Sequence, residues 1–365
     1  MIVGVPKEIK VHESRVAITP EGVSEFVAAG HTVIIEDGAG VGSAILNEDF
    51  VAAGATIVSN SDGVWNAADL VLKVKEPIEA EYLKMRQDQT LFTYLHLAAS
   101  KACTDALIAS KTTAIAYETV EVNGTLPLLS PMSEVAGRLA TQVGASVLQR
   151  PNGGRGVLLG GVPGVAPAHV VVIGGGTAGL NAAVMAIGLG AEVTILDRSI
   201  SRLQYIDSAY SGRIKTLISS LHAIEREVRA ADLVIGAVLV HGAKAPKLIS
   251  NALVETMKQG SVLVDIAIDQ GGCFEDSRPT THAEPTFAVH GSIFYCVANM
   301  PGAVPVTSTY ALTNATLPYA LSIANHGWKA ACEKDSNLAK GLNVHNGQVY
   351  HEAVAQAHGY EYVKF

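Results

Sequence analysis

Cysteine is scarce in this chain, and its cysteines are widely scattered. Cys103, Cys273, Cys296 and Cys332 are four among 365 residues, and no two of them have CxxC spacing. Disulfide frameworks and structural zinc sites both depend on closely and regularly spaced cysteines. The sequence therefore predicts neither a disulfide framework nor a metal site, and we expect the four thiols to be reduced and mostly buried.

Long apolar runs and basic clusters are also missing. No uninterrupted apolar run reaches the ~18 to 20 residues that a membrane helix needs, and the first residues lack the pattern of a secretory signal. The net charge is −8, without any long cluster of lysine and arginine, whereas nucleic-acid binding requires a basic surface. We therefore expect a cytoplasmic protein with no membrane and no nucleic-acid partner.

The composition and the order of apolar segments predict an α/β protein. Hydrophobic residues make up 48% of the chain and charged residues 16%, enough to bury two cores at this length. Helix-like segments separate short apolar segments, and the first helix has Thr19 as its N-cap, Pro20 in its first turn and Gly30 at its end. Such alternation predicts parallel strands with crossover helices. The predicted strands of this series are 2–5, 31–36, 55–58, 69–74, 90–96 and 113–118, and a further helix is predicted over 101–111.

Two long helix patterns, 130–150 and 309–328, predict the domain boundaries. The glycine-rich segment 153–167 lacks the GK[ST] ending of a P-loop, so we interpret it as a turn-forming connection. We expect two Rossmann-like domains with mostly parallel sheets, joined by the long helices with a cleft between them. One domain is discontinuous, 1–129 plus 306–365, and the other is 130–305. The strands predicted for the second domain are 170–174, 192–197, 232–238, 261–268 and 293–299.

The strongest motif is VVVIGGGTAGLNAAVMAIGLGAEVTILD, residues 170–197. Gly174, Gly176 and Gly179 form a GxGxxG pattern after a strand and before a helix. These glycines allow a tight turn, close approach of a pyrophosphate to the backbone, and close packing of helix on strand. Asp197, 18 residues after the last glycine, can accept hydrogen bonds from a ribose and repel a 2′-phosphate. The motif predicts NAD binding, although Arg198 could tolerate the phosphate of NADP.

Five polar residues follow predicted strands. They are Arg15, Lys75, His96, Asp269 and Asn299. Each alone has an ordinary structural explanation, such as a solvated loop charge, a strand-end lysine, a core histidine or a turn residue. Ligands of open parallel sheets, however, bind beyond the carboxyl ends of the strands, and all five residues are predicted to lie there.

The chemistry of these five residues is mutually consistent. Arg15 can bind a carboxylate in a bidentate manner, and Lys75 adds a second cation for the carboxylate or a developing carbonyl oxygen. His96 can exchange a proton near neutral pH, and Asp269 could stabilise a transient cationic nitrogen. Beside a nicotinamide site, the set predicts oxidation of an amino or hydroxy acid.

Ordered runs along nearly the whole chain closely resemble the bacterial alanine dehydrogenase family. The resemblance implies reversible, NAD-dependent oxidative deamination of L-alanine to pyruvate and ammonium. It also implies a homohexamer, in which the discontinuous domain binds substrate and the inserted Rossmann domain binds NAD. The matching runs are VPKEIK, ESRVAITP, VLKVKEP, LFTYLHLAAS, PMSEVAGRLA, GGRGVLLGGVPGV, VVVIGGGTAG, VLVDIAIDQGGCFE, NMPGAVPVTSTYALTNATLPY and HGW.

The resemblance also assigns roles to residues of this chain. His96 and Asp269 resemble the catalytic pair, with His96 as general acid/base. Arg15, Lys75, His96 and Asn299 are the expected substrate-binding residues. The expected NAD contacts are Ser133, Gly174, Gly176, Thr177, Ala178, Gly179, Asp197, Arg202, Ser219, Val238, Leu239, Ile266, Asp269, Val297, Ala298, Asn299 and Met300.

Three alternatives remain at the level of the sequence. The same family contains the soluble NAD-binding part of proton-translocating transhydrogenase, which has no amino-acid site, so the joint presence of Lys75, His96 and Asp269 disfavours it. Saccharopine-type dehydrogenases share the architecture, but FTYLHLAAS is less similar to them. A non-catalytic NAD-binding regulator would bind NADH without turnover. Because the active site is predicted to combine both domains, we expect the domains to close on binding.

Overall fold

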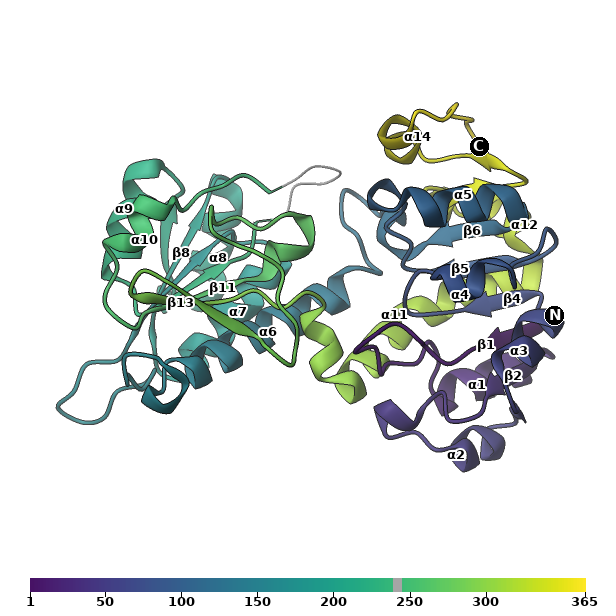
Figure 1. Ribbon diagram of the computed structural model, residues 1–365, viewed down its shortest axis with the longest axis horizontal. Coiled ribbons are helices and arrows are strands. Elements are labelled where there is room, and N and C mark those ends of the chain that lie inside the picture. The colour runs from purple at the N-terminus through teal and green to yellow at the C-terminus, as the bar shows by residue number, and fades with distance from the viewer. Residues whose placement is uncertain (239–244) are drawn as a thin grey trace. The chain divides into compact units, whose positions relative to one another are not determined.

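The computed structural model describes residues 1–238 and 245–365, which divide into two compact units. Unit 1 contains Met1–Met132 and Val304–Phe365, and unit 2 contains Ser133–Ala303. Each unit has one mostly parallel sheet covered by helices (Figure 1). The predicted α/β class with two mostly parallel sheets is therefore confirmed.

In the described chain, unit 1 contains an eight-stranded sheet. Its strands are β1 (Ile2–Val5), β2 (Thr32–Glu36), β3 (Thr56–Val58), β4 (Leu70–Leu72), β5 (Thr90–Thr93), β6 (Thr113–Ala116), β14 (Leu342–His345) and β15 (Gln348–Val349). Their order is β15-β14-β6-β5-β4-β1-β2-β3. Strands β1 to β6 are parallel, whereas β14 and β15 are antiparallel additions at one edge. The parallel strand order therefore reverses between β1 and β4.

Helices pack against the sheet of unit 1. As the sequence predicts, Thr19 caps the first helix by accepting a hydrogen bond from Gly22 N. One core joins Trp65, Leu91, Leu107 and Val354, and so ties two helices of the first segment to the C-terminal segment. The helices are α1 (Pro20–Ala28), α2 (Asn47–Ala52), α3 (Ser61–Ala67), α4 (Glu79–Tyr82), α5 (Lys101–Ser110), α11 (Pro305–His326), α12 (Trp328–Lys334), α13 (Ser336–Ala339) and α14 (Glu352–His358), with 3-10 turns η1 (Val41–Ser43), η2 (Leu97–Ala99) and η3 (Tyr117–Thr119).

The described part of unit 2 contains a seven-stranded sheet. Its strands are β7 (His169–Ile173), β8 (Glu192–Asp197), β9 (Lys215–Ile218), β10 (Leu233–Gly236), β11 (Val262–Asp265), β12 (Thr286–Val289) and β13 (Ser292–Tyr295). Their order is β12-β13-β11-β10-β7-β8-β9, and the edge strand β12 is the only antiparallel strand described in this sheet. The parallel order is the 3-2-1-4-5-6 arrangement of dinucleotide-binding sheets, and it reverses between β7 and β10.

Helices lie on both sides of the unit 2 sheet (Figure 1). One core packs Ile224, Val228 and Leu253 against the strand residues Val171 and Val234. The helices are α6 (Ser130–Val147), α7 (Thr177–Gly188), α8 (Ile200–Tyr210), α9 (Leu221–Ala230) and α10 (Asn251–Glu255), with 3-10 turns η4 (Arg150–Asn152), η5 (Ile266–Gln270) and η6 (Met300–Ala303).

Several strands end earlier than the apolar runs predict. The predicted strand 261–268 ends at Asp265, because its carboxylate accepts a hydrogen bond from Ala267 N and starts η5. The predicted strand 90–96 ends at Thr93, because the amides of Leu95 and His96 donate to a side chain instead of a neighbouring strand. Apolar runs therefore locate the strands but overestimate their length.

The structure bears on two of the predictions, one about the cysteines and one about membrane helices. All four cysteines are buried, as predicted. Among the helices formed by residues 1–238 and 245–365, none is both long enough and apolar enough to cross a membrane.

Candidate functional site

The strand orders place the candidate residues at the positions where open α/β sheets bind ligands. Such sites lie beyond the carboxyl ends of the strands, where the order reverses. In unit 1 the reversal is between β1 and β4; Arg15 follows β1, Lys75 follows β4 and His96 follows the next strand, β5. In unit 2 the glycine-rich turn follows β7, beside the end of β10. Each unit therefore has its own candidate ligand-binding edge.

Arg15 lies in a buried ion pair with Glu13. Its side chain is 2% exposed and that of Glu13 is 1% exposed. Arg15 Nε donates to Glu13 Oε1 at 2.7 Å and Nη2 donates to Oε2 at 2.5 Å, while Nη1 faces Met132 Sδ at 3.1 Å. Burial alone would raise the pKa of Glu13, but the hydrogen bonds and charge of Arg15 outweigh burial and lower it. Glu13 therefore already forms the bidentate interaction with the Arg15 guanidinium that the sequence predicted for a substrate carboxylate.

The backbone at Lys75 is held by a second buried group of charges. Glu8 Oε1 accepts hydrogen bonds from Val74 N at 2.6 Å and from Lys75 N at 3.3 Å. Its other oxygen accepts from Lys73 Nζ at 3.0 Å, and the same ammonium lies 2.9 Å from Glu81 Oε1. Burial raises the pKa of Glu8 although Lys73 opposes this. Because buried charges need partners, this group fixes the chain that presents Lys75.

His96 is not a core residue. Its side chain is 45% exposed, and its backbone is left-handed, with φ 48° and ψ 37°. The imidazole stacks on the buried Tyr94 ring, with 5.9 Å between centroids and 6° between planes. Glu118 Oε1 accepts a hydrogen bond from His96 N at 2.6 Å and lies 3.9 Å from Nδ1. The ring is therefore accessible to a ligand yet held from two sides.

The glycine-rich turn of unit 2 has the geometry of a phosphate-binding turn. Gly174 has φ +102°, and a Cβ there would lie 2.6 Å from Ala237 O. A Cβ on Gly179 would lie 1.8 Å from Gly174 O, so α7 can pack on β7 only with glycine at this position. Among the described residues, nothing lies within 4 Å of a Cβ placed on Gly176, and no side chain caps α7. Open space thus lies in front of a helix N-terminus, which favours an anion.

Asp197 and Arg202 both contact this turn. Asp197 Oδ2 accepts from Gly175 N at 2.7 Å and Oδ1 accepts from Ser199 N at 2.8 Å. Arg202 Nε donates to Gly175 O, and its guanidinium lies 5.0 Å from the Tyr205 ring centroid. Arg198 is exposed beside Asp197. The acid predicted to contact a ribose therefore also orders the turn that would hold the pyrophosphate.

The remaining predicted residues of unit 2 lie on segments after its strands. Asp269 is exposed on η5 after β11, and Asn299 has left-handed φ 61° in the segment after β13. Leu239 lies outside the described residues. The other predicted cofactor residues are spread over α6, α7 and the strand-end segments, namely Ser133, Thr177, Ala178, Ser219, Val238, Ile266, Val297, Ala298 and Met300.

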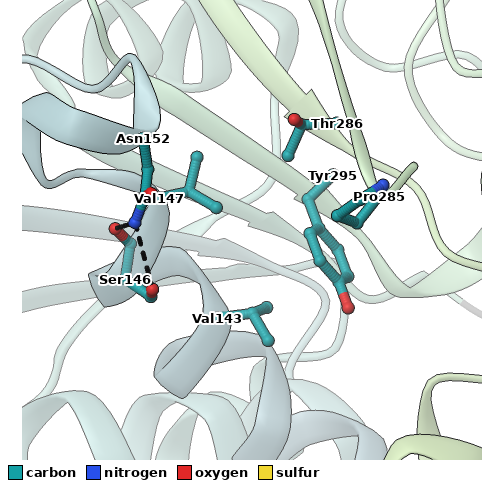
Figure 2. Close-up of a pocket in the computed structure, with 7 residues that line it drawn as sticks. All are labelled: Val143, Ser146, Val147, Asn152, Pro285, Thr286 and Tyr295. Atoms are coloured by element: carbon teal, nitrogen blue, oxygen red, sulfur yellow. Dashed lines mark hydrogen bonds between the residues drawn. The ribbon is translucent and has the colours of Figure 1, made fainter. Parts of the chain in front are cut away.

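A separate cavity of about 330 Å³ lies in unit 2, at α6 and the antiparallel edge of the sheet (Figure 2). None of the predicted site residues lines it, so it is distinct from the glycine-rich turn. Its lining residues are Val143, Ser146, Val147, Asn152, Pro285, Thr286 and Tyr295.

Sequence reasoning missed the carboxylates that hold the cationic and imidazole side chains. Glu13 is two residues before Arg15, and this spacing was visible in the sequence. Glu118 follows β6, so the same strand-end argument that selected His96 would have selected it. Glu8 lies 67 residues from Lys75, and no local pattern indicates that contact.

The strand order and the glycine-rich turn of unit 2 define a protein of the dinucleotide-binding α/β class. Two family models match the chain: "Alanine dehydrogenase/PNT, N-terminal domain" over residues 4–136 and "Alanine dehydrogenase/PNT, C-terminal domain" over residues 140–352. The chain belongs to the alanine dehydrogenase/PNT family.

Similar proteins support this assignment over the full length. Alanine dehydrogenase of Mycolicibacterium smegmatis is 67% identical, covering 98% of this chain and 96% of the relative. Alanine dehydrogenase of Bacillus subtilis is 55% identical, covering 100% and 96%. A solved L-alanine dehydrogenase structure has a TM-score of 0.95 at 54% identity, covering 98% of this chain and 99% of that one. A transhydrogenase from Sinorhizobium meliloti, at 24% identity and a TM-score of 0.83, covers 97% of this chain and 100% of that one, and shares the fold.

Proposed function

We propose that this protein is an NAD-dependent L-alanine dehydrogenase, which converts L-alanine and water reversibly to pyruvate and ammonium. The observation that carries the proposal is the position of Arg15, Lys75 and His96 beyond β1, β4 and β5, around the reversal of strand order in unit 1. Full-length similarity to curated alanine dehydrogenases supports L-alanine as the substrate. We assign substrate binding to unit 1 and NAD binding to unit 2.

The residues of unit 2 fit NAD. The open space at Gly176 and the N-terminus of α7 suit a pyrophosphate. Asp197 suits a ribose with free hydroxyls, because its carboxylate would repel a 2′-phosphate. Arg202 lies close enough to the turn to contact the phosphates or the ribose. When bound, NAD accepts the hydride that leaves the α-carbon of the substrate.

Arg15 and Lys75 bind the substrate carboxylate in this proposal. Glu13 holds the Nε and Nη2 edge of Arg15, and Nη1 donates to Met132 Sδ. While the pair with Glu13 persists, a substrate carboxylate would therefore have to replace the weak sulfur acceptor at Nη1. Lys75 neutralises the rest of the carboxylate charge or polarises the carbonyl oxygen of pyruvate. The buried Glu13 thus acts as a fixed counter-ion that orients Arg15, and Asn299 contributes a further polar contact to the substrate.

His96 is the general acid/base of the proposed reaction. After the α-carbon is oxidised to an iminium, His96 takes a proton from the water that attacks it and returns a proton to the leaving nitrogen as the carbinolamine collapses. The carboxylate of Asp269 stabilises the transient positive charge on nitrogen. An exposed imidazole suits this role, because it must reach both water and substrate.

The proposal also includes the cellular location of the enzyme and its oligomeric state. We expect the enzyme to act in the cytoplasm, as a homohexamer, in agreement with the resemblance to its family. Sedimentation of the purified protein tests the hexamer directly.

The experiment is to mix purified protein with L-alanine and NAD and to follow NADH by its absorbance. Parallel reactions replace NAD by NADP or omit the amino acid. We expect NADH to form only with both L-alanine and NAD. If NADH binds but neither cofactor is reduced, the protein is instead a transhydrogenase-like or regulatory NAD-binding protein.

A further inference from the structure

Glu118 contacts the chain around His96 in three ways. Its carboxylate accepts the amide hydrogen of His96 at 2.6 Å and that of Leu95 at 3.2 Å, and its Oε1 lies 3.9 Å from His96 Nδ1. The Glu118 side chain is 14% exposed, compared with 45% for His96. A largely buried carboxylate on η3 therefore faces both the backbone and the ring of an accessible histidine.

The backbone contacts explain why His96 can keep its conformation. A left-handed residue with a Cβ is uncommon, and it directs successive amide groups toward one point, where they form an anion-binding concavity. The carboxylate of Glu118 occupies that point. Leu95 is buried and Tyr94, buried beside it, donates a hydrogen bond from its hydroxyl to Leu128 O at 2.6 Å, so the segment before His96 is fixed as well.

The carboxylate of Glu118 lies on the Nδ1 side of the imidazole, which bears on the roles of the two ring nitrogens. A carboxylate opposite Nδ1 favours the tautomer with its proton on Nδ1, which leaves the Nε2 lone pair to act as a base. Once the ring has taken a second proton, the same carboxylate stabilises the imidazolium. A separation of 3.9 Å is too long for a hydrogen bond, but catalytic contacts often shorten when substrate binds.

We propose that Glu118 is a positioning residue for His96: it fixes the left-handed backbone, selects the Nδ1-protonated imidazole, and stabilises the imidazolium formed during turnover. This inference rests on the proposed function, since it gives His96 the role of general acid/base. Glu118 acts through His96 and does not itself touch the substrate.

The test uses Glu118→Gln, in which an amide oxygen can still accept the backbone hydrogen bonds but the charge is lost. We expect kcat for L-alanine oxidation to fall about 10- to 100-fold, while KM for L-alanine and the dissociation constant of NADH stay within about twofold of the parent. Glu118→Asp, which keeps the charge, should restore part of kcat. Glu121→Gln is the matched control, because Glu121 is 40% exposed, pairs with Lys340, and should leave every value unchanged.

A double-mutant cycle separates positioning from a general structural effect. In a His96→Ala background, Glu118→Gln should lower the residual turnover no further. Equal losses in both backgrounds, kcat within about twofold of the parent in Glu118→Gln, or a loss confined to KM would each overturn the proposal. If Glu118→Gln does not fold, Glu118→Asp takes its place in the cycle.

A spectroscopic readout keeps this inference separate from the proposed function. The ¹⁵N shifts of the His96 ring, assigned by comparison with His96→Ala, should move away from the Nδ1-protonated tautomer in Glu118→Gln. If the parent protein does not oxidise L-alanine, the proposed function fails, yet the ring shifts still decide the contact. Unchanged ring shifts in Glu118→Gln would overturn the inference whatever the activity.

Discussion

Three glycines lie in α7 or at its N-cap. Replacing each of them by alanine should distinguish an effect on NADH binding from an effect on the stability of the fold. Gly176 is the N-cap, Gly179 lies in the first turn and Gly188 is the last residue of the helix. An added Cβ would meet no atom of the described residues within 4 Å at Gly176 and at Gly188, but would lie 1.8 Å from Gly174 O at Gly179. Alanine is therefore expected to have three different effects at these positions.

Gly179→Ala should damage the fold of unit 2. The Cβ and the carbonyl oxygen would have to separate by about 1.5 Å to reach ordinary contact, and the two nearest atoms, O and C of Gly174, are backbone. Overpacking of this kind costs about 1–3 kcal/mol, and rigid neighbours place the cost at the upper end. We expect thermal unfolding of Gly179→Ala to begin at a clearly lower temperature than in the parent.

Gly176→Ala should lower the melting temperature much less than Gly179→Ala, since its only cost is that alanine is a poorer N-cap than glycine, but it should weaken NADH binding. The methyl group would fill the space in front of the helix N-terminus, so the dissociation constant of NADH should rise at least about tenfold, or about 1.4 kcal/mol. Gly188→Ala, the control, should change neither quantity unfavourably, since alanine favours the helix by up to about 1 kcal/mol. Unchanged NADH affinity in Gly176→Ala, measured by fluorescence titration, would refute the placement of the pyrophosphate.

Substitutions of charged groups in unit 1 make three further predictions. His96→Ala should lower turnover by a factor of about 10² to 10⁴ while NADH binding is retained; near-normal turnover would exclude His96 as general acid/base. Lys73→Met leaves Glu8 and Glu81 buried without their cation, and should lower the free energy of unfolding in urea by about 3–5 kcal/mol. That loss should shrink at lower pH, because burial raises the pKa of Glu8 and protonation removes the buried charge; a loss that does not change with pH would contradict this. Glu13 has a lowered pKa in the fold, since Arg15 outweighs the effect of burial, so its carboxylate stabilises the fold above its unfolded pKa and this contribution is lost as the pH falls through the folded pKa. Glu13→Gln should therefore flatten the acid limb of stability against pH, and an acid limb parallel to that of the parent would show that the pair contributes nothing.

The parts of the fold that sequence predicted are those with strong local signals. Apolar runs located β1 to β6 and most strands of unit 2, and Thr19 marked the start of α1, because hydrophobic periodicity and caps act over a few residues. The edge strands β9 and β12 and the short hairpin of β14 and β15 escaped prediction. None of the residues of β9 and β12 is fully buried, and β15 has only two residues, so burial leaves little pattern in them. In β14 the buried polar residue Asn343 interrupts the apolar run.

The candidate site also has features that the sequence predicted and features that it did not. Strand-end position and residue type were enough to select Arg15, Lys75 and His96. The left-handed backbone of His96 and the carboxylates of Glu8 and Glu118 depend on contacts between segments far apart in the chain. Sequence could therefore select candidate side chains for the chemistry, but not the side chains that hold them in place.

The most direct test of the proposed function is to follow the hydrogen of the substrate α-carbon. L-alanine carrying deuterium at that carbon is incubated with the protein and NAD, and the reduced cofactor is examined by mass spectrometry, with D-alanine as control. We expect reduced cofactor that carries one deuterium from L-alanine, and no reduction with D-alanine. Reduced cofactor without the label, or no reduction by a protein that still binds NADH, would contradict the proposed function.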